Sequence, residues 1–93
     1  MNFEWDPQKA ERNLSKHGVS FAEASTVFGD DLTITIPDPD HSIDEERYIT
    51  IGWSNRHRLL MVAHADRGNR IRIISARELT RREQKAYYEE ENN

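Results

Sequence analysis

The chain has no cysteine among its 93 residues, which excludes disulfide bonds and metal sites built on thiolates. It also lacks a long hydrophobic run. The longest apolar segment, residues 59–63, is far too short to cross a bilayer, and the first residues show no basic-then-apolar signal pattern. Internal repeats and low-complexity linkers are absent as well. We therefore expect a single small domain over residues 1–93 in the cytoplasm.

Basic residues are scarce in the first half of the chain. Residues 1–46 contain three basic and eleven acidic side chains, a balance of −8, whereas residues 47–93 contain ten basic and six acidic ones, a balance of +4. Nine of the ten basic residues in the second half are arginine, whose planar fork suits bidentate contacts with phosphate or carboxylate. The asymmetry predicts a basic face for a polyanion, or two halves that attract each other.

The first third of the chain carries clear helix signals. Asp6 followed by Pro7 is typical of a helix start, and Gly18 is typical of a helix end. Ser20 and Glu23 have capping-box spacing and predict a second helix that ends near Gly29. A short edge strand is expected to precede these helices, over residues 3–6.

The rest of the sequence predicts strands and a last helix. Leu32, Ile34 and Ile36 alternate as in a strand, and further strands are expected over residues 47–53, 58–66 and 70–76. The segment 58–66 is apolar on both faces, so we expect it in the centre of the sheet. Residues 37–42 are too rich in proline and aspartate for a strand. Together with a helix over 80–90, these segments predict an α+β fold. It has two N-terminal helices, a four-stranded antiparallel sheet plus the short N-terminal strand, and a C-terminal helix.

Three segments of the chain resemble the BrnT family of toxins: WDPQKAERNLSKHGVSFAEASTVF, DDLTITIPDPDHSIDEERYITIG and RIISARELTRREQKAYYEE. The resemblance implies a RelE-like ribonuclease fold and RNA cleavage that inhibits translation. It further implies neutralisation by a BrnA-like antitoxin of ribbon-helix-helix type, in a heterotetramer that contacts DNA only through the antitoxin. No cofactor is expected.

Metal-independent RNA cleavage requires groups that hold the phosphate and groups that move protons. We select Arg72 and Arg77 as the leading catalytic candidates, because arginine can stabilise charge on phosphorus but is a poor base. Their alternative role is an ion pair with an acidic residue such as Glu45 or Glu46. Glu46 is also our candidate base, with a structural ion pair as its alternative. His64 is a candidate proton carrier, or else a structural histidine on the sheet.

Four further arginines are candidate RNA-binding residues. Arg67 and Arg70 flank a hairpin tip, where a solvated turn explains them equally well. Arg81 and Arg82 occupy the first turn of the last helix, where the macrodipole disfavours cations. The family resemblance makes Glu83 and Tyr87 secondary candidates, although helix capping and packing also account for them. Lys16 and His17, by contrast, lie in the last turn of a predicted helix, where the dipole favours cations. This position favours a structural role for them.

Two alternatives to a metal-independent nuclease remain. Residues 38–46 carry five carboxylates and a histidine, donors that suit Mg²⁺ or Mn²⁺, but their spacing matches no defined ligand loop, so we predict no metal site. The second alternative is a non-catalytic module, or an inactive toxin copy, that binds a partner protein through its basic C-terminal half. The net charge of −4 favours this second alternative, because nucleic-acid binding relies on positive charge.

Overall fold

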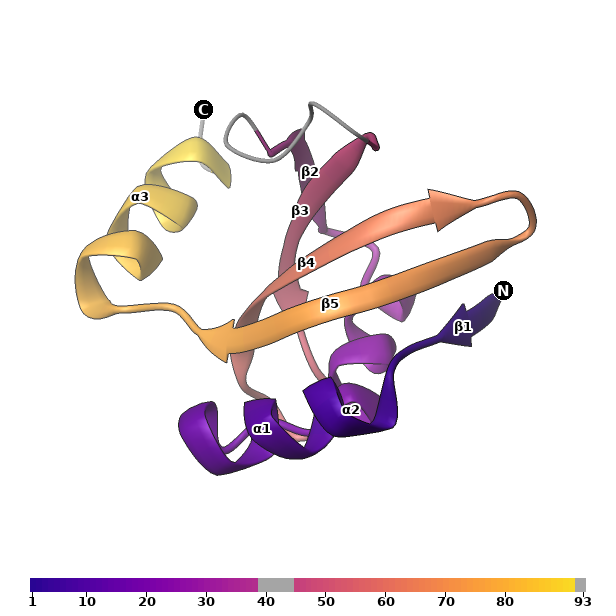
Figure 1. Cartoon of the computed structure of the whole chain (residues 1–93). Helices are drawn as coiled ribbons and strands as arrows, with labels where there is room; N and C mark the ends of the chain where they lie inside the picture. Colours follow the sequence, from indigo (N-terminus) through magenta and orange to yellow (C-terminus); the bar gives the residue numbers. More distant parts are fainter. Residues whose placement is uncertain (39–44, 92–93) are drawn as a thin grey trace.

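The computed structural model describes residues 1–38 and 45–91 (Figure 1). Its elements are, in chain order, β1 (Asn2–Glu4), α1 (Pro7–His17), α2 (Phe21–Thr26), the 3-10 helix η1 (Val27–Gly29), β2 (Ile34–Pro37), β3 (Arg47–Trp53), β4 (Leu59–Arg67), β5 (Arg70–Glu78) and α3 (Arg81–Glu91). The expected α+β class is confirmed. No helix among the described residues is long and apolar enough to span a membrane.

All five strands form one mixed sheet in the order β1-β5-β4-β3-β2. The central position expected for β4 is therefore confirmed. The prediction of a purely antiparallel sheet with a separate short strand needs correction, because β1 joins the edge of the same sheet and pairs in parallel with β5. Three residues of β1 pair with residues 70–72, so among the described residues no strand lies beside the second half of β5 on that edge.

Several predicted boundaries differ from the observed ones for local reasons. Leu32 lies in a turn rather than a strand. Its N–H donates a hydrogen bond of 3.1 Å to the Asp30 carboxylate, and this bond forms an Asx turn. Pro37 closes β2 instead of belonging to a loop, as an edge strand can accommodate a residue without an N–H. Asp38 lies outside the strand, as predicted, and the other predicted loop residues, 39–42, lie outside the described part of the chain. The second helix ends at Thr26 and continues as η1.

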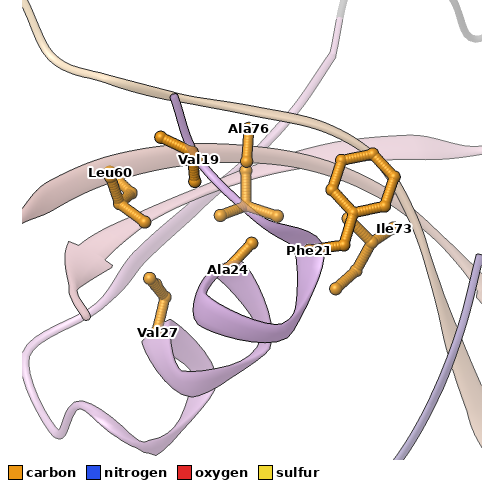
Figure 2. Close-up of a cluster of buried hydrophobic side chains, with 8 residues drawn as sticks. Val19, Phe21, Ala24, Val27, Leu60, Ile73 and Ala76 are labelled. Atoms are coloured by element: carbon orange, nitrogen blue, oxygen red, sulfur yellow. The ribbon is translucent and has the colours of Figure 1, made fainter. Parts of the chain in front are cut away.

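The two N-terminal helices and α3 cover different faces of the sheet (Figure 1). The main core lies under α2 and η1, where their apolar residues meet β4 and β5 (Figure 2); its members are Val19, Phe21, Ala24, Val27, Leu60, Val62, Ile73 and Ala76. A smaller cluster of Leu59, Leu79 and Tyr87 joins α3 to the opposite face. Only one end of that second face is covered in this way.

The buried side chain of Asn13 fixes α1 against the free edge of β5. Its amide oxygen accepts a hydrogen bond from the Ala76 N–H at 3.1 Å, and its amide nitrogen donates to the Ala76 carbonyl at 2.8 Å. The same nitrogen donates to the Val19 carbonyl at 2.9 Å. Asn13 therefore replaces the missing neighbouring strand at this point and satisfies backbone groups that would otherwise be unpaired.

Candidate functional site

The sheet face opposite α1 and α2, here called the open face, carries all five arginines of the described strands. Alternate residues of β4 share this face, and strand register places their partners there too. The β5 partners of Met61, Ala63, Ala65 and Arg67 are Arg77, Ser75, Arg72 and Arg70. On the other side, Ala65 pairs with Arg47 of β3. One sheet face thus presents Arg47, Arg67, Arg70, Arg72 and Arg77.

A β-bulge in β5 places Arg72 and Arg77 on the same face. Residues five apart in a regular strand point to opposite faces. Here Ala63 pairs with Ser75 and His64 pairs with Ile73, so Ile74 has no partner in β4. The extra residue shifts the alternation by one. Both leading candidates consequently face the same side.

A hollow of about 360 Å³, here called the central hollow, lies on the open face beside Arg77, whereas Arg72 is not among its lining residues. Its floor is formed by the small or apolar side chains of Ile49, Met61, Ala63 and Ile74. The polar residues that line it are His17, Asp38, Arg47, Ser75 and Arg77. The hollow therefore combines an apolar floor with two guanidinium groups, an imidazole, a hydroxyl and a carboxylate.

Arg77 and Glu83 form a bidentate ion pair beside the central hollow. The two guanidinium nitrogens lie 2.8 and 2.9 Å from the two carboxylate oxygens. The hydrogen bonds that Arg77 donates lower the pKa of Glu83 from 4.5 to about 2, and the same bonds raise the pKa of Arg77. Glu83 also completes the predicted capping box, because it accepts from the Thr80 N–H at 2.9 Å. The acidic partner of Arg77 is thus Glu83, not Glu45 or Glu46.

The other arginines of the open face differ in how they are neutralised. Glu45 lies 3.3 Å from both Arg47 and Arg67, and Glu4 lies 3.8 Å from Arg70. Arg72 forms no ion pair with any residue in the described ranges. Arg77 is therefore paired with a carboxylate, whereas the guanidinium of Arg72 has no carboxylate partner among the described residues.

The candidates Glu46 and His64 lie away from the central hollow. His64 shares the opposite face of β4 with Leu60 and Val62, is 4% exposed, and its Nε2 lies 2.8 Å from the Thr50 hydroxyl. Burial lowers its pKa, and Nδ1 has no hydrogen-bond partner among the residues described. Glu46 accepts a hydrogen bond of 2.9 Å from Tyr48, whose ring stacks on His64 at 5.8 Å.

Three of the remaining candidates lie on α3. Arg81 and Arg82 are exposed in its first turn, as expected, and form no ion pair within residues 1–38 and 45–91. Tyr87 is 3% exposed, packs in the α3 core and donates to the Leu32 carbonyl at 3.1 Å. The acidic segment considered for a metal falls mainly on residues 39–44, outside the described part of the chain.

Sequence reasoning missed the residues that complete the central hollow. The register of β3 places the Arg47 side chain on the open face. The alternation of side chains along the predicted strand could have indicated this position. His17 and Ser75 had no such signal, because their proximity depends on how α1 lies along β5 and on the bulge. Tyr48 was also missed; its hydrogen bond to Glu46 raises its pKa.

Comparisons with known proteins agree with this architecture. A family model described as "Ribonuclease toxin, BrnT, of type II toxin-antitoxin system" matches residues 5–83. The 1.1 Å crystal structure of the Brucella abortus ribonuclease toxin BrnT superposes with a TM-score of 0.69 and 25% identity, covering 87% of this chain and 99% of that chain. No curated protein sequence matches significantly. The family resemblance seen in the sequence is therefore confirmed: the chain belongs to the BrnT family of ribonuclease toxins of type II toxin–antitoxin systems.

Proposed function

We propose that the protein is a metal-independent endoribonuclease whose catalytic surface is the open face around Arg72 and Arg77. One observation carries the proposal: both arginines share one sheet face, and Arg77, which lines the central hollow, holds the carboxylate of Glu83. This arrangement supplies two permanent positive charges on one face, and a carboxylate at the arginine that lines the hollow. Phosphodiester cleavage by the 2′-hydroxyl group of RNA needs both kinds of group.

In the proposed reaction, the 2′-oxygen of the substrate attacks phosphorus and the bond from phosphorus to the 5′-oxygen breaks. The products are a 2′,3′-cyclic phosphate and a 5′-hydroxyl end. The 2′-hydroxyl proton passes to a base, and the departing 5′-oxygen receives a proton from an acid. Arg72 and Arg77 stabilise the additional negative charge on the phosphate oxygens, a role that fits their permanently protonated guanidinium groups.

Arg77 can bind phosphate only by exchanging its present partner. Its planar fork now accommodates two carboxylate oxygens of Glu83, and two phosphate oxygens fit the same fork. The pKa of about 2 makes Glu83 a weak base while Arg77 holds it. When phosphate replaces Glu83 at the Arg77 guanidinium group, the pKa of Glu83 rises and its carboxylate becomes more basic. Substrate binding thereby prepares Glu83 as the proton acceptor.

The remaining candidates take secondary roles in this proposal. Arg67 and Arg70 at the hairpin tip, and Arg81 and Arg82 on α3, contact flanking parts of the RNA. Glu46 and His64 lie away from the central hollow, so the proton transfers are assigned to the open face instead. Tyr87 supports α3 through its packing.

Family membership supports the following biological context for the proposal. RNA cleavage inhibits translation in the cytoplasm, and a BrnA-like antitoxin of ribbon-helix-helix type neutralises the toxin. We propose a toxin–antitoxin heterotetramer in which the antitoxin alone contacts DNA. A relationship of the fold to the RelE ribonucleases stays a prediction of the family resemblance.

A non-catalytic binding module is the second candidate function. It is favoured by the ion pairs of Arg47, Arg67, Arg70 and Arg77, which already neutralise much of the basic face. In that case the open face would bind the antitoxin or another protein, and RNA would be neither bound nor cut.

The test is expression in bacteria without antitoxin, comparing wild type with the Arg72→Ala/Arg77→Ala variant. We expect growth arrest and new RNA ends bearing 5′-hydroxyl groups from wild type only. The purified enzyme should retain its activity in EDTA. Arrest that persists in a folded double variant would contradict the site assignment. Well-expressed wild type that causes neither arrest nor new ends would favour the binding module.

A further inference from the structure

A shallow groove of about 300 Å³ runs between α1 and β5, here called the α1 groove. Figure 1 shows α1 lying beside β5. The α1 side of the groove is lined by Lys9, Arg12 and Lys16, together with Asn13 and His17. These positions recur at intervals of three or four residues, so they occupy one stripe of the helix.

The three cations of this groove are the only basic residues of the first 46 positions, which contain eleven acids. In an acidic segment, scattered basic side chains would be expected to pair with neighbouring carboxylates. Lys9, Arg12 and Lys16 instead form no ion pair with any described residue, although six other basic side chains do. Their positive charge is therefore available to an external anion.

Helix stability alone does not explain this placement. Lys16 and His17 in the last turn of α1 interact favourably with the helix dipole. Lys9 lies in the first turn, where the dipole disfavours a cation, and no acidic residue lies in that turn. The N-cap carboxylate of Asp6 attracts Lys9 and Arg12 electrostatically but forms no ion pair with either, so a structural explanation covers Lys16 fully and Lys9 only in part.

The α1 groove is continuous with the central hollow. His17, Ile74 and Ser75 line both. Ile74 is the bulged residue of β5, so the irregularity that brings Arg72 and Arg77 to one face also lies where the groove meets the hollow. A chain with one phosphate at Arg77 can therefore continue past His17 and along α1.

We propose that the α1 groove binds the sugar–phosphate backbone of single-stranded RNA on one side of the cleaved bond. This inference deepens the proposed nuclease function and rests on it for the identity of the ligand. From Lys9 to Lys16 the helix axis advances about 10 Å at about 1.5 Å per residue. That length corresponds to about three nucleotides of a stacked strand, at about 3.4 Å each. The groove contacts phosphates, so it contributes affinity without base preference.

The test compares two variants that lose the same charge. Lys9→Gln/Lys16→Gln removes two groove cations and keeps Arg12, whose Nε donates to the Gln8 carbonyl at 3.4 Å. Glutamine and lysine have similar helix propensities, so α1 should remain folded. The control, Arg56→Gln/Lys85→Gln, removes two exposed cations that line neither the groove nor the hollow.

Binding is measured by fluorescence anisotropy with a labelled 2′-O-methyl oligonucleotide of about 12 nucleotides, within the usual site sizes of single-strand binders. The methyl groups remove the nucleophile, so binding is observed without cleavage. Two lost phosphate contacts should reduce the slope of log Kd against log salt by about 1.4. Between about 50 and 200 mM salt, the Kd of wild type should rise about sevenfold more than that of the groove variant. The control variant should follow wild type.

A cleavage assay separates the groove from the catalytic proposal. With a long RNA substrate the groove variant should show a raised KM, with kcat within about twofold of wild type. An unchanged Kd and salt slope in the groove variant would overturn the inference. It would also be overturned if the groove variant lost antitoxin affinity while RNA binding stayed the same. Salt-dependent binding through the groove without any RNA cleavage by wild type would support the inference and contradict the nuclease proposal.

Discussion

Arg77 donates two hydrogen bonds, of 2.8 and 2.9 Å, to Glu83 and so joins the end of β5 to the first turn of α3. The same carboxylate caps the helix by accepting from the Thr80 N–H. One pair of residues therefore links the open face of the sheet to α3. Because both groups also belong to the proposed catalytic surface, each can be tested for a chemical role and a structural role separately.

Replacing Glu83 by glutamine should abolish most activity without unfolding α3. Glutamine retains the capping-box geometry but cannot accept the 2′-hydroxyl proton. We expect kcat to fall by about 100-fold or more, the usual contribution of a general base. Single-turnover cleavage of a labelled RNA measures the effect, and circular dichroism checks the helix. Activity close to that of wild type would remove Glu83 from the proton-transfer step.

The Arg77–Glu83 pair should make stability depend on acid pH. The pKa of Glu83 is lowered from 4.5 to about 2 in the folded protein, so the folded state favours the ionised form. Its contribution is complete well above pH 4.5 and is lost as the pH falls toward about 2. Melting temperatures of wild type and Glu83→Gln should therefore converge over this range. Parallel curves for the two proteins would contradict the shifted pKa.

His64→Gln should leave cleavage nearly unchanged and alter stability instead. His64 lies on the face packed by Phe28, with ring centroids 5.0 Å apart, and away from Arg77. We expect kcat to change by less than about tenfold, below the effect of removing a general acid or base. A decrease in kcat of about 100-fold in a folded variant would show that His64 takes part in catalysis.

The buried imidazole should also produce a stability change near neutral pH. Burial lowers the pKa of His64 below 6.5, so the folded protein holds the neutral form. Stability is then complete above pH 6.5 and decreases as the pH falls below that value, because the unfolded chain binds the proton more readily. Urea midpoints for wild type between about pH 5 and 8 should show this decline. His64→Gln should lack this component.

Asn13→Leu should destabilise the fold at the free edge of β5. The substitution removes the bonds to both backbone groups of Ala76 and the bond to the Val19 carbonyl. Leaving buried backbone groups unpaired costs about 1–3 kcal/mol each, so the melting temperature should fall by at least about 4 °C. Leu14→Ala, an exposed change in the next position, is the control. Equal melting temperatures for the two variants would show that Asn13 is dispensable.

The sequence by itself determined the elements whose signals are local. Asp6 before Pro7 and Gly18 bounded α1, and Thr80 with Glu83 began α3, because capping depends on residues within one helical turn. The two-sided apolar character of residues 58–66 correctly indicated the centre of the sheet. The family, too, was recognisable from segments spread along the chain.

Only the tertiary structure decided how distant residues meet. Ser20 and Glu23 matched a capping box, yet the Glu23 side chain bonds to Ser54 and Arg58 across 31 and 35 residues. No local pattern marks the bulge at Ile74, because it arises from the pairing of β5 with β4. That single extra residue brings Arg72 and Arg77 to one face. The position of His17 beside the central hollow likewise depends on Asn13 binding the edge of β5, a contact between residues 63 positions apart.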